Sequence, residues 1–253
     1  MAEADFKDTT VVITDAARGL GLGMARRFGQ VGAHVIITGQ DAKTAANAAA
    51  VLRAEGLSAS FEPLDVRDPA QSLSLVQKVT AERGNIDVWV NNAGVSHTSS
   101  AETHPSEWWE ETIAVNLSGA FFCSQAVGRH MLSRGQGVIV NVAAADGYRP
   151  IEGRVAYSVA EAGVIMLTQA LGIEWAGRGV RVVGIAPGAV ADAKTPDEIE
   201  GPMRLYERRT PLGRLGTVDE IAEAVLFLAG NEASYLTAET MRVDGGWVAY
   251  QLF

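Results

Sequence analysis

The chain has 253 residues, of which 47% are hydrophobic and 20% charged, which is typical of one α/β domain with a sizeable core. Its net charge of −9 argues against a nucleic-acid phosphate backbone as partner, because such a partner requires a basic surface. The N-terminal MAEADFKDTT lacks the regions of a signal peptide, and we see no apolar run near the roughly 20 residues of a membrane span. We therefore expect a soluble cytoplasmic protein that contacts no membrane.

Short β-branched runs alternate with amphipathic segments along the chain. We expect strands at 11–14, 34–38, 58–66, 86–94, 137–145, 180–188 and 240–246. We expect helices from the glycine-rich loop through residue 28 and at 41–55, 69–84, 106–134, 157–179 and 218–230. This alternation predicts a single α/β domain over residues 1–253, with a doubly wound parallel sheet that is covered on both faces.

The stretch 189–212 has the weakest pattern, with several charges and prolines after the strand that ends at 188. Ligands of such sheets bind outside the carboxyl ends of the strands. We therefore expect a flexible flap over a pocket at 189–212.

A glycine-rich loop, TDAARGLG at 14–21, follows the first strand. Glycines that open a helix let its N–H groups approach a diphosphate at the positive end of the helix. The loop alone is a weak signal, because glycine turns also serve packing. Its place after the first strand makes a dinucleotide site the stronger interpretation.

Further motifs follow in order: NNAG at 91–94, Asn116 in VNLSGAF, Tyr157 at the start of a helix, Pro187-Gly188 after the sixth strand, and VDGGW at 243–247. Together they resemble the short-chain dehydrogenase/reductase family over essentially the whole length. The resemblance implies a Rossmann-type domain that binds NAD or NADP, needs no metal, and forms a homotetramer or dimer.

In that family a Ser–Tyr–Lys set with a helper Asn moves a hydride to or from a carbonyl or alcohol. The corresponding catalytic candidates are Tyr157, Asn116 and, at the lysine position, Glu161. The resemblance also implies cofactor contacts from Arg18, Gly19, Leu20, Gly21, Asp65, Val66, Asn92, Ala93, Gly94, Pro187 and Gly188.

Several positions depart from the family pattern. The first glycine of the loop is Asp15, the serine position is Ala144, and the lysine position is Glu161. The position after Pro187-Gly188 that often holds a threonine is Asp192. At the end of the second strand, Gly39 and Gln40 provide neither an acid for the NAD ribose nor a base for the NADP phosphate, and only Arg18 suggests a 2′-phosphate.

These departures change the expected chemistry. A carboxylate at position 15 would repel the anionic groups of the cofactor by about 1–4 kcal/mol, depending on the dielectric. An anion at position 161 raises the tyrosine pKa above its ordinary value of about 10, so Tyr157 would be a poor base near pH 7. Positions that carry the fold are intact, whereas those at the nicotinamide end are altered, so ordinary hydride transfer is not expected.

Two interpretations of the Tyr157–Glu161 pair stay open. Tyr157 is either a proton donor in a redirected site or a leftover phenol, and Glu161 is either a catalytic carboxylate or the ion-pair partner of Arg18, Arg149 or Arg154. One hypothesis is that Arg18 turns toward Asp15 and Glu161 and fills the cofactor cleft with an ion-pair network.

Three functions compete. The first is a non-catalytic binding or assembly subunit that forms a homo-oligomer or pairs with an active relative. The second is a cofactor-independent lyase or isomerase that uses Tyr157 and Glu161. The third is a weak NAD(P)-dependent dehydrogenase of a polyol, sugar or ketone. Fold alone does not choose among them.

Overall fold

The fold is a seven-stranded parallel sheet in the order β3-β2-β1-β4-β5-β6-β9, seen in a computed structural model that describes residues 6–191 and 202–250. Its strands are β1 (Thr10–Ile13), β2 (His34–Gly39), β3 (Ala59–Pro63), β4 (Val88–Asn91), β5 (Gly137–Val142), β6 (Val180–Pro187) and β9 (Thr240–Val243). A separate short pair joins β7 (Val190–Ala191) to β8 (Gly216–Thr217). The predicted single doubly wound α/β domain is confirmed in its architecture.

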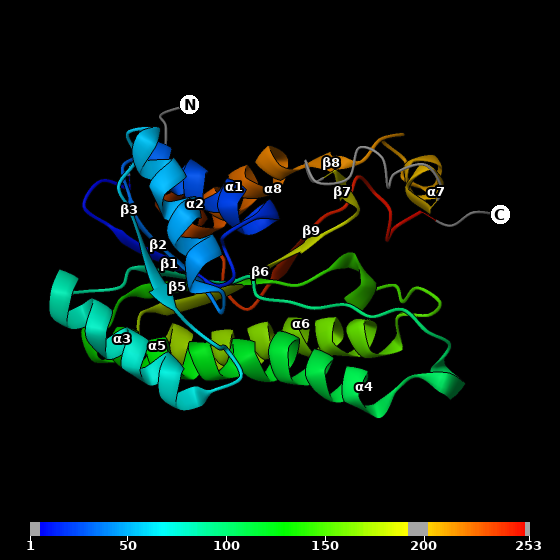
Figure 1. The fold of residues 1–253 in the computed structure, drawn as a ribbon, viewed down its shortest axis with the longest axis horizontal. Coiled ribbons are helices and arrows are strands. Elements are labelled where there is room, and N and C mark those ends of the chain that lie inside the picture. The colour runs from blue at the N-terminus through cyan, green and yellow to red at the C-terminus, as the bar shows by residue number, and fades with distance from the viewer. Residues whose placement is uncertain (1–5, 192–201, 251–253) are drawn as a thin grey trace.

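Helices cover both faces of the sheet (Figure 1). They are α1 (Gly19–Gln30), α2 (Ala42–Ala54), α3 (Pro69–Arg83), α4 (Ser106–Thr112), α5 (Gly119–Arg134), α6 (Val155–Ala176), α7 (Pro202–Arg209) and α8 (Val218–Ala229). One core cluster joins α1, α2 and α8 to the sheet, and a second joins α3, α5 and α6 to the opposite face. Both faces are apolar because successive strand residues point to opposite sides and each side meets a helical layer.

The strand order reverses at β1, which has β2 on one side and β4 on the other. In open α/β sheets this is the point at which ligands bind, outside the carboxyl ends of the strands. The glycine-rich loop leaves β1 at that edge and enters α1. The fold therefore places the loop where a nucleotide would be bound.

The helix predicted over 106–134 is interrupted, which the sequence pattern did not indicate. A π-helical stretch, Ile113–Ser118, separates α4 from α5 and contains Asn116. Such π-bulges are often found at functional sites. The segment predicted to be a flap contains β7 and α7, and its residues 192–201, including Asp192, lie outside the described residues.

Helix α6 is long and apolar enough by length and composition to cross a membrane, which the sequence analysis had not recognised. Half of its apolar window is buried inside the protein. Leu171 and Trp175 pack in the core beneath the sheet. The helix is therefore a core helix of the domain.

Candidate functional site

The loop after β1 is fixed to the end of β4 by hydrogen bonds. The Thr14 hydroxyl accepts the N–H groups of Asn92 at 2.8 Å and Ala93 at 2.9 Å. The Asn92 side-chain amide donates to the carbonyl oxygens of Thr14 at 2.9 Å and Asp15 at 3.2 Å. A Cβ at Gly21 would lie 2.6 Å from the Ala16 Cα, so only glycine allows this close approach. These contacts give Asn92 and Gly21 structural roles in shaping the loop.

Asp15 adopts a left-handed backbone conformation, with φ of 49°. Aspartate tolerates this region better than most residues, which explains how it replaces a glycine here. Its Oδ1 atom lies 4.0 Å from the point where a Cβ on Gly39 would stand. The carboxylate therefore points toward the end of β2.

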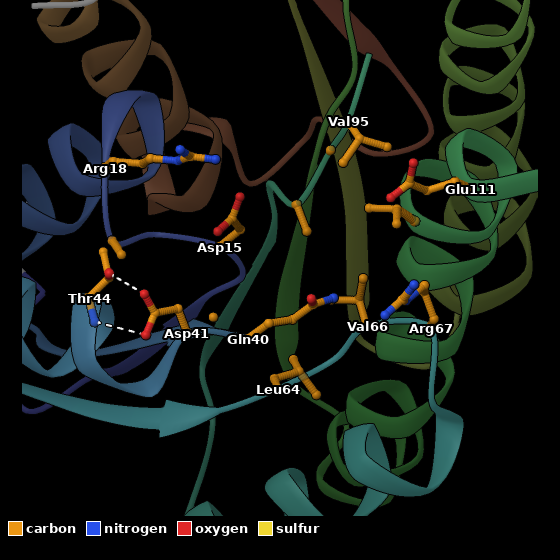
Figure 2. Close-up of a pocket in the computed structure, with 15 residues that line it drawn as sticks. Asp15, Arg18, Gln40, Asp41, Thr44, Leu64, Val66, Arg67, Val95 and Glu111 are labelled. Carbon is orange, nitrogen blue, oxygen red and sulfur yellow. Dashed lines mark hydrogen bonds between the residues drawn. The ribbon is translucent and has the colours of Figure 1, made fainter. Parts of the chain in front are cut away.

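A cavity of about 500 Å³ opens at the carboxyl ends of β1, β2, β3 and β4 (Figure 2). It is lined by Asp15, Ala17, Arg18, Gly39, Gln40, Asp41, Thr44, Leu64, Val66, Arg67, Ala93, Gly94, Val95, Glu111 and Val115. Four of the residues expected to bind a cofactor are among them: Arg18, Val66, Ala93 and Gly94. Its size and its mixed apolar and polar lining suit a small-molecule site.

The other expected cofactor residues surround this cavity or serve packing. Gly19 and Leu20 form the first turn of α1. The Asp65 carboxylate is held by the Arg67 guanidinium, with a shortest distance of 2.6 Å. Pro187 ends β6, and the Gly188 N–H donates to the Val243 carbonyl at 3.0 Å.

The proposed Arg18 ion-pair network is wrong. Arg18 is exposed, and within residues 6–191 and 202–250 it forms no ion pair with Asp15 or Glu161. Glu161, on helix α6, is buried inside the protein, and its hydrogen-bond partner comes from another segment and not from Arg18.

That partner is Asn116 of the π-helical stretch. Its Nδ2 atom donates to Glu161 Oε1 at 2.8 Å and to the Val95 carbonyl at 3.2 Å, while its Oδ1 accepts the Val95 N–H at 2.9 Å. Glu161 is only 4% exposed. Burial raises its pKa to about 7, against the opposing effect of the Asn116 hydrogen bond. The expectation that an arginine pairs with Glu161 is therefore wrong, and Asn116 links Glu161 to Val95 in the loop after β4.

Tyr157 lies on the same helix beneath an arginine. The Arg154 guanidinium carbon is 4.3 Å from the centre of the Tyr157 ring. Burial raises the pKa of the phenol, and the nearby Glu161 raises it further, whereas Arg154 acts in the opposite direction. The Tyr157 phenol therefore keeps its proton near pH 7.

The sequence analysis missed the role of Asp146. Its Oδ2 lies 2.9 Å from Nη1 of Arg154, whose Nη2 donates to the Ser96 hydroxyl at 3.0 Å. Burial raises the pKa of Asp146, and Arg154 opposes that shift. A signal was present in the sequence, since an acid directly after the alanine run at 143–145 is unusual at the end of a buried strand.

The serine position provides no hydroxyl. Ala143 and Ala144 are 5% and 8% exposed, so their methyl groups are packed.

Two histidines in the loop after β4 already have side-chain hydrogen-bond partners. His97 lies 2.8 Å from Glu111, and His104 lies 2.6 Å from the Ser99 hydroxyl. Residues 6–191 and 202–250 contain no group of three or more side chains that could hold a metal ion.

The residues fit the two halves of a nicotinamide dinucleotide unequally. The cavity with Leu64 and Val66 on its wall suits the adenosine half. At the other half, the position at which the family resemblance implies a lysine carries a buried carboxyl group, Glu161, that accepts a hydrogen bond from Asn116. The cavity therefore has the size and lining of a nucleotide site, whereas position 161, whose charge acts on Tyr157, carries a carboxyl group and not a cation.

Comparisons with known proteins identify the family. The family model described as "Enoyl-(Acyl carrier protein) reductase" matches residues 16–248. Gluconate 5-dehydrogenase of Gluconobacter oxydans is 32% identical over 93% of this chain and 93% of its own. The 3-oxoacyl-[acyl-carrier-protein] reductase FabG of Thermotoga maritima is 38% identical over 94% of this chain and 96% of its own.

A solved structure extends the likeness to three dimensions. It is that of a gluconate 5-dehydrogenase from Burkholderia cenocepacia in complex with NADP and tartrate, with a TM-score of 0.93 and 31% identity over 98% of both chains. Sequence and fold thus agree over nearly the full length. The chain belongs to the short-chain dehydrogenase/reductase family.

Proposed function

We propose that this protein is a dinucleotide-binding member of its family that has lost ordinary hydride transfer and serves as a non-catalytic binding or assembly subunit. The observation that carries the proposal is the buried Glu161 at the lysine position, held by Asn116 at 2.8 Å. A carboxylate there disfavours the tyrosinate that proton abstraction requires, so the reaction loses its base. Ala144 removes the orienting hydroxyl as well.

The support for nucleotide binding is separate from the support for lost catalysis. The cavity of about 500 Å³ lies at the switch point of the sheet and is bordered by the glycine loop. It is lined by neither Tyr157 nor Glu161. Binding of a nucleotide there does not depend on the altered residues of α6.

The experiment is a calorimetric titration of the purified protein with NADH and with NADPH, followed by an assay on polyols, sugars and ketones. We expect submillimolar binding of a dinucleotide with turnover that is no faster than a slow residual rate. The double variant Ala144→Ser/Glu161→Lys should then gain activity by roughly 10²-fold or more, because it restores the orienting hydroxyl and the cation.

Glu161→Gln is the matched control, because it removes the anion without adding a cation and should gain much less. Turnover by the wild-type protein at the rate of the double variant would contradict the loss of catalysis. Failure of both dinucleotides to bind at millimolar concentration would contradict the binding role.

A second function has one specific observation in its favour. Tyr157 and Glu161 lie four residues apart on α6 and so share one face of the helix, and burial raises the pKa of the carboxyl group toward the neutral range in which a proton-exchanging group works. This supports a lyase or isomerase that uses Tyr157 and Glu161 without a nicotinamide. Its test is solvent deuterium exchange into carbonyl substrates, which the wild-type protein would catalyse and Glu161→Gln would not.

A further inference from the structure

We infer that Asp15 is the acid that reads the adenosine ribose in this cavity, so that the protein selects NAD over NADP. The inference rests on the nucleotide binding proposed above and names the form of nucleotide that the cavity takes. It reverses the interpretation of Asp15 as a group that only repels the cofactor.

The end of β2 lacks the acid that commonly binds the adenosine ribose in such domains. In dinucleotide-binding α/β domains, an acid about 20 residues after the glycine loop accepts a hydrogen bond from the ribose 2′-hydroxyl. That place is the end of β2, where Gly39 and Gln40 carry no charge. The sheet therefore ends there without the group that normally distinguishes a ribose from its phosphate.

The Asp15 side chain, in the loop after β1, extends to the end of β2. Its Oδ1 atom is 4.0 Å from the Cβ position of Gly39, from which an acidic side chain at residue 39 would start. Thr38 O accepts the Ala16 N–H at 3.0 Å, which holds the loop against β2. Figure 2 shows the Asp15 carboxylate directed into the cavity. The absence of a side chain at Gly39 leaves the space that Asp15 uses.

The neighbouring acid, Asp41, already has another role. Asp41 also lines the cavity, but its carboxylate caps α2, accepting the N–H groups of Lys43 at 3.0 Å and Thr44 at 3.3 Å. The Asp15 carboxylate, in contrast, has no hydrogen-bond donor among the residues that the structure describes. It is the acceptor at this end of the cavity that a ribose hydroxyl could satisfy.

The charge of Arg18, by contrast, would favour NADP over NAD. It lines the same cavity and would attract a 2′-phosphate. Its side chain is exposed, however, so its charge is screened by water, whereas Asp15 is partly buried. A 2′-phosphate beside Asp15 would bring like charges together, so we expect the carboxylate to decide the selection.

Calorimetric titration with NADH and NADPH tests the inference by binding alone. We expect the wild-type protein to bind NADH at least about tenfold more tightly than NADPH, and Asp15→Asn to lose most of that preference. Asparagine tolerates the left-handed backbone at residue 15, and a thermal melt checks that the variant is folded.

Two further variants sharpen the result. Asp15→Gly should lose the preference, and Asp15→Gly/Gly39→Asp should recover it, because a Cβ at Gly39 meets nothing closer than the Ala45 Cβ at 3.7 Å. Glu174→Gln, which removes a charge at an exposed position on α6 outside the cavity, should leave the ratio of the two affinities unchanged.

Tighter binding of NADPH by the wild-type protein would overturn the inference and leave the proposed nucleotide binding standing. So would an increase in affinity for both dinucleotides in Asp15→Gly, which would show that the carboxylate repels them. If neither binds to the wild-type protein, the proposed function itself fails and the inference fails with it.

Discussion

Among single residues, Glu161 stands on helix α6 at the position where the family resemblance implies a lysine. The carboxyl group is 4% exposed and has a neutral amide as its hydrogen-bond partner, so its ionisation is costly. The identity of the altered residues, Asp15, Ala144 and Glu161, could be read from the sequence. Their partners could not, because they come from distant segments brought together by the fold.

The raised pKa of Glu161 predicts a dependence of stability on pH. Its folded pKa of about 7 lies above the ordinary 4.5, so the folded state binds the proton more tightly, and stability falls as pH rises from about 4.5 to 7. Glu161→Gln removes this dependence and can still accept the Asn116 hydrogen bond. We expect the variant to gain on the order of 3 kcal/mol in unfolding free energy relative to wild type between pH 5 and pH 8.

Urea unfolding at both pH values measures the effect. Glu174→Gln is the control, because Glu174 lies exposed on the same helix. An equal difference between Glu161→Gln and wild type at pH 5 and pH 8 would show that Glu161 is charged throughout this range.

The ion pair of Asp146 and Arg154 gives a second prediction at this scale. Their side chains are 10% and 24% exposed, so removing one partner leaves a largely buried charge. We expect Arg154→Gln to destabilise the protein by about 1–3 kcal/mol, and Asp146→Asn/Arg154→Gln to cost less than the sum of its single changes. Additive costs in this double-mutant cycle, measured by urea unfolding, would mean that the two groups do not interact.

Among the elements, the π-helical stretch Ile113–Ser118 connects Glu161 of α6 to the loop after β4 through Asn116. The sequence predicted one helix over 106–134, because an inserted residue does not disturb an apolar pattern enough to be seen. Strand β4 ends at Asn91, shorter than predicted, because Asn92 and Ala93 bond to the Thr14 hydroxyl. Element types were thus predictable, while interruptions set by tertiary hydrogen bonds were not.

Asn116→Ala tests this connection. The change leaves the Val95 N–H and the buried Glu161 carboxyl without their partner, which should cost about 2 kcal/mol or more. Amide hydrogen exchange should also become faster in residues 93–97. The control Asn47→Ala, at an exposed position on α2, should stay within about 0.5 kcal/mol of wild type. Unchanged exchange after Asn116→Ala would contradict the role of Asn116 in holding the loop.

At the scale of the whole molecule, the sheet order and the two helical layers follow from the alternation of strands and helices in the sequence. One side of helix α6 exposes large apolar side chains. Val159, Met166 and Ile173 lie seven residues apart on one side of α6 and are 46%, 61% and 75% exposed. An apolar stripe of this kind marks an interaction site, which supports the proposed homo-oligomer.

Size-exclusion chromatography with light scattering checks this assembly. We expect a dimer or tetramer for the wild-type protein and a monomer for Met166→Glu/Ile173→Glu, because two buried carboxylates would break an apolar interface. Val51→Glu, at a similarly exposed position on α2, should leave the mass unchanged. A monomeric wild-type protein would contradict the homo-oligomer.

We predict that Tyr157 stays protonated and therefore cannot act as a base near neutral pH, and its protonation can be measured without knowing the substrate. Ultraviolet absorbance near 295 nm reports tyrosinate, and the difference between wild type and Tyr157→Phe isolates this phenol. Because burial and Glu161 both raise its pKa, we predict that the difference stays flat up to about pH 10, the ordinary tyrosine value. Tyrosinate from Tyr157 that appears between pH 6 and pH 8 would contradict the account.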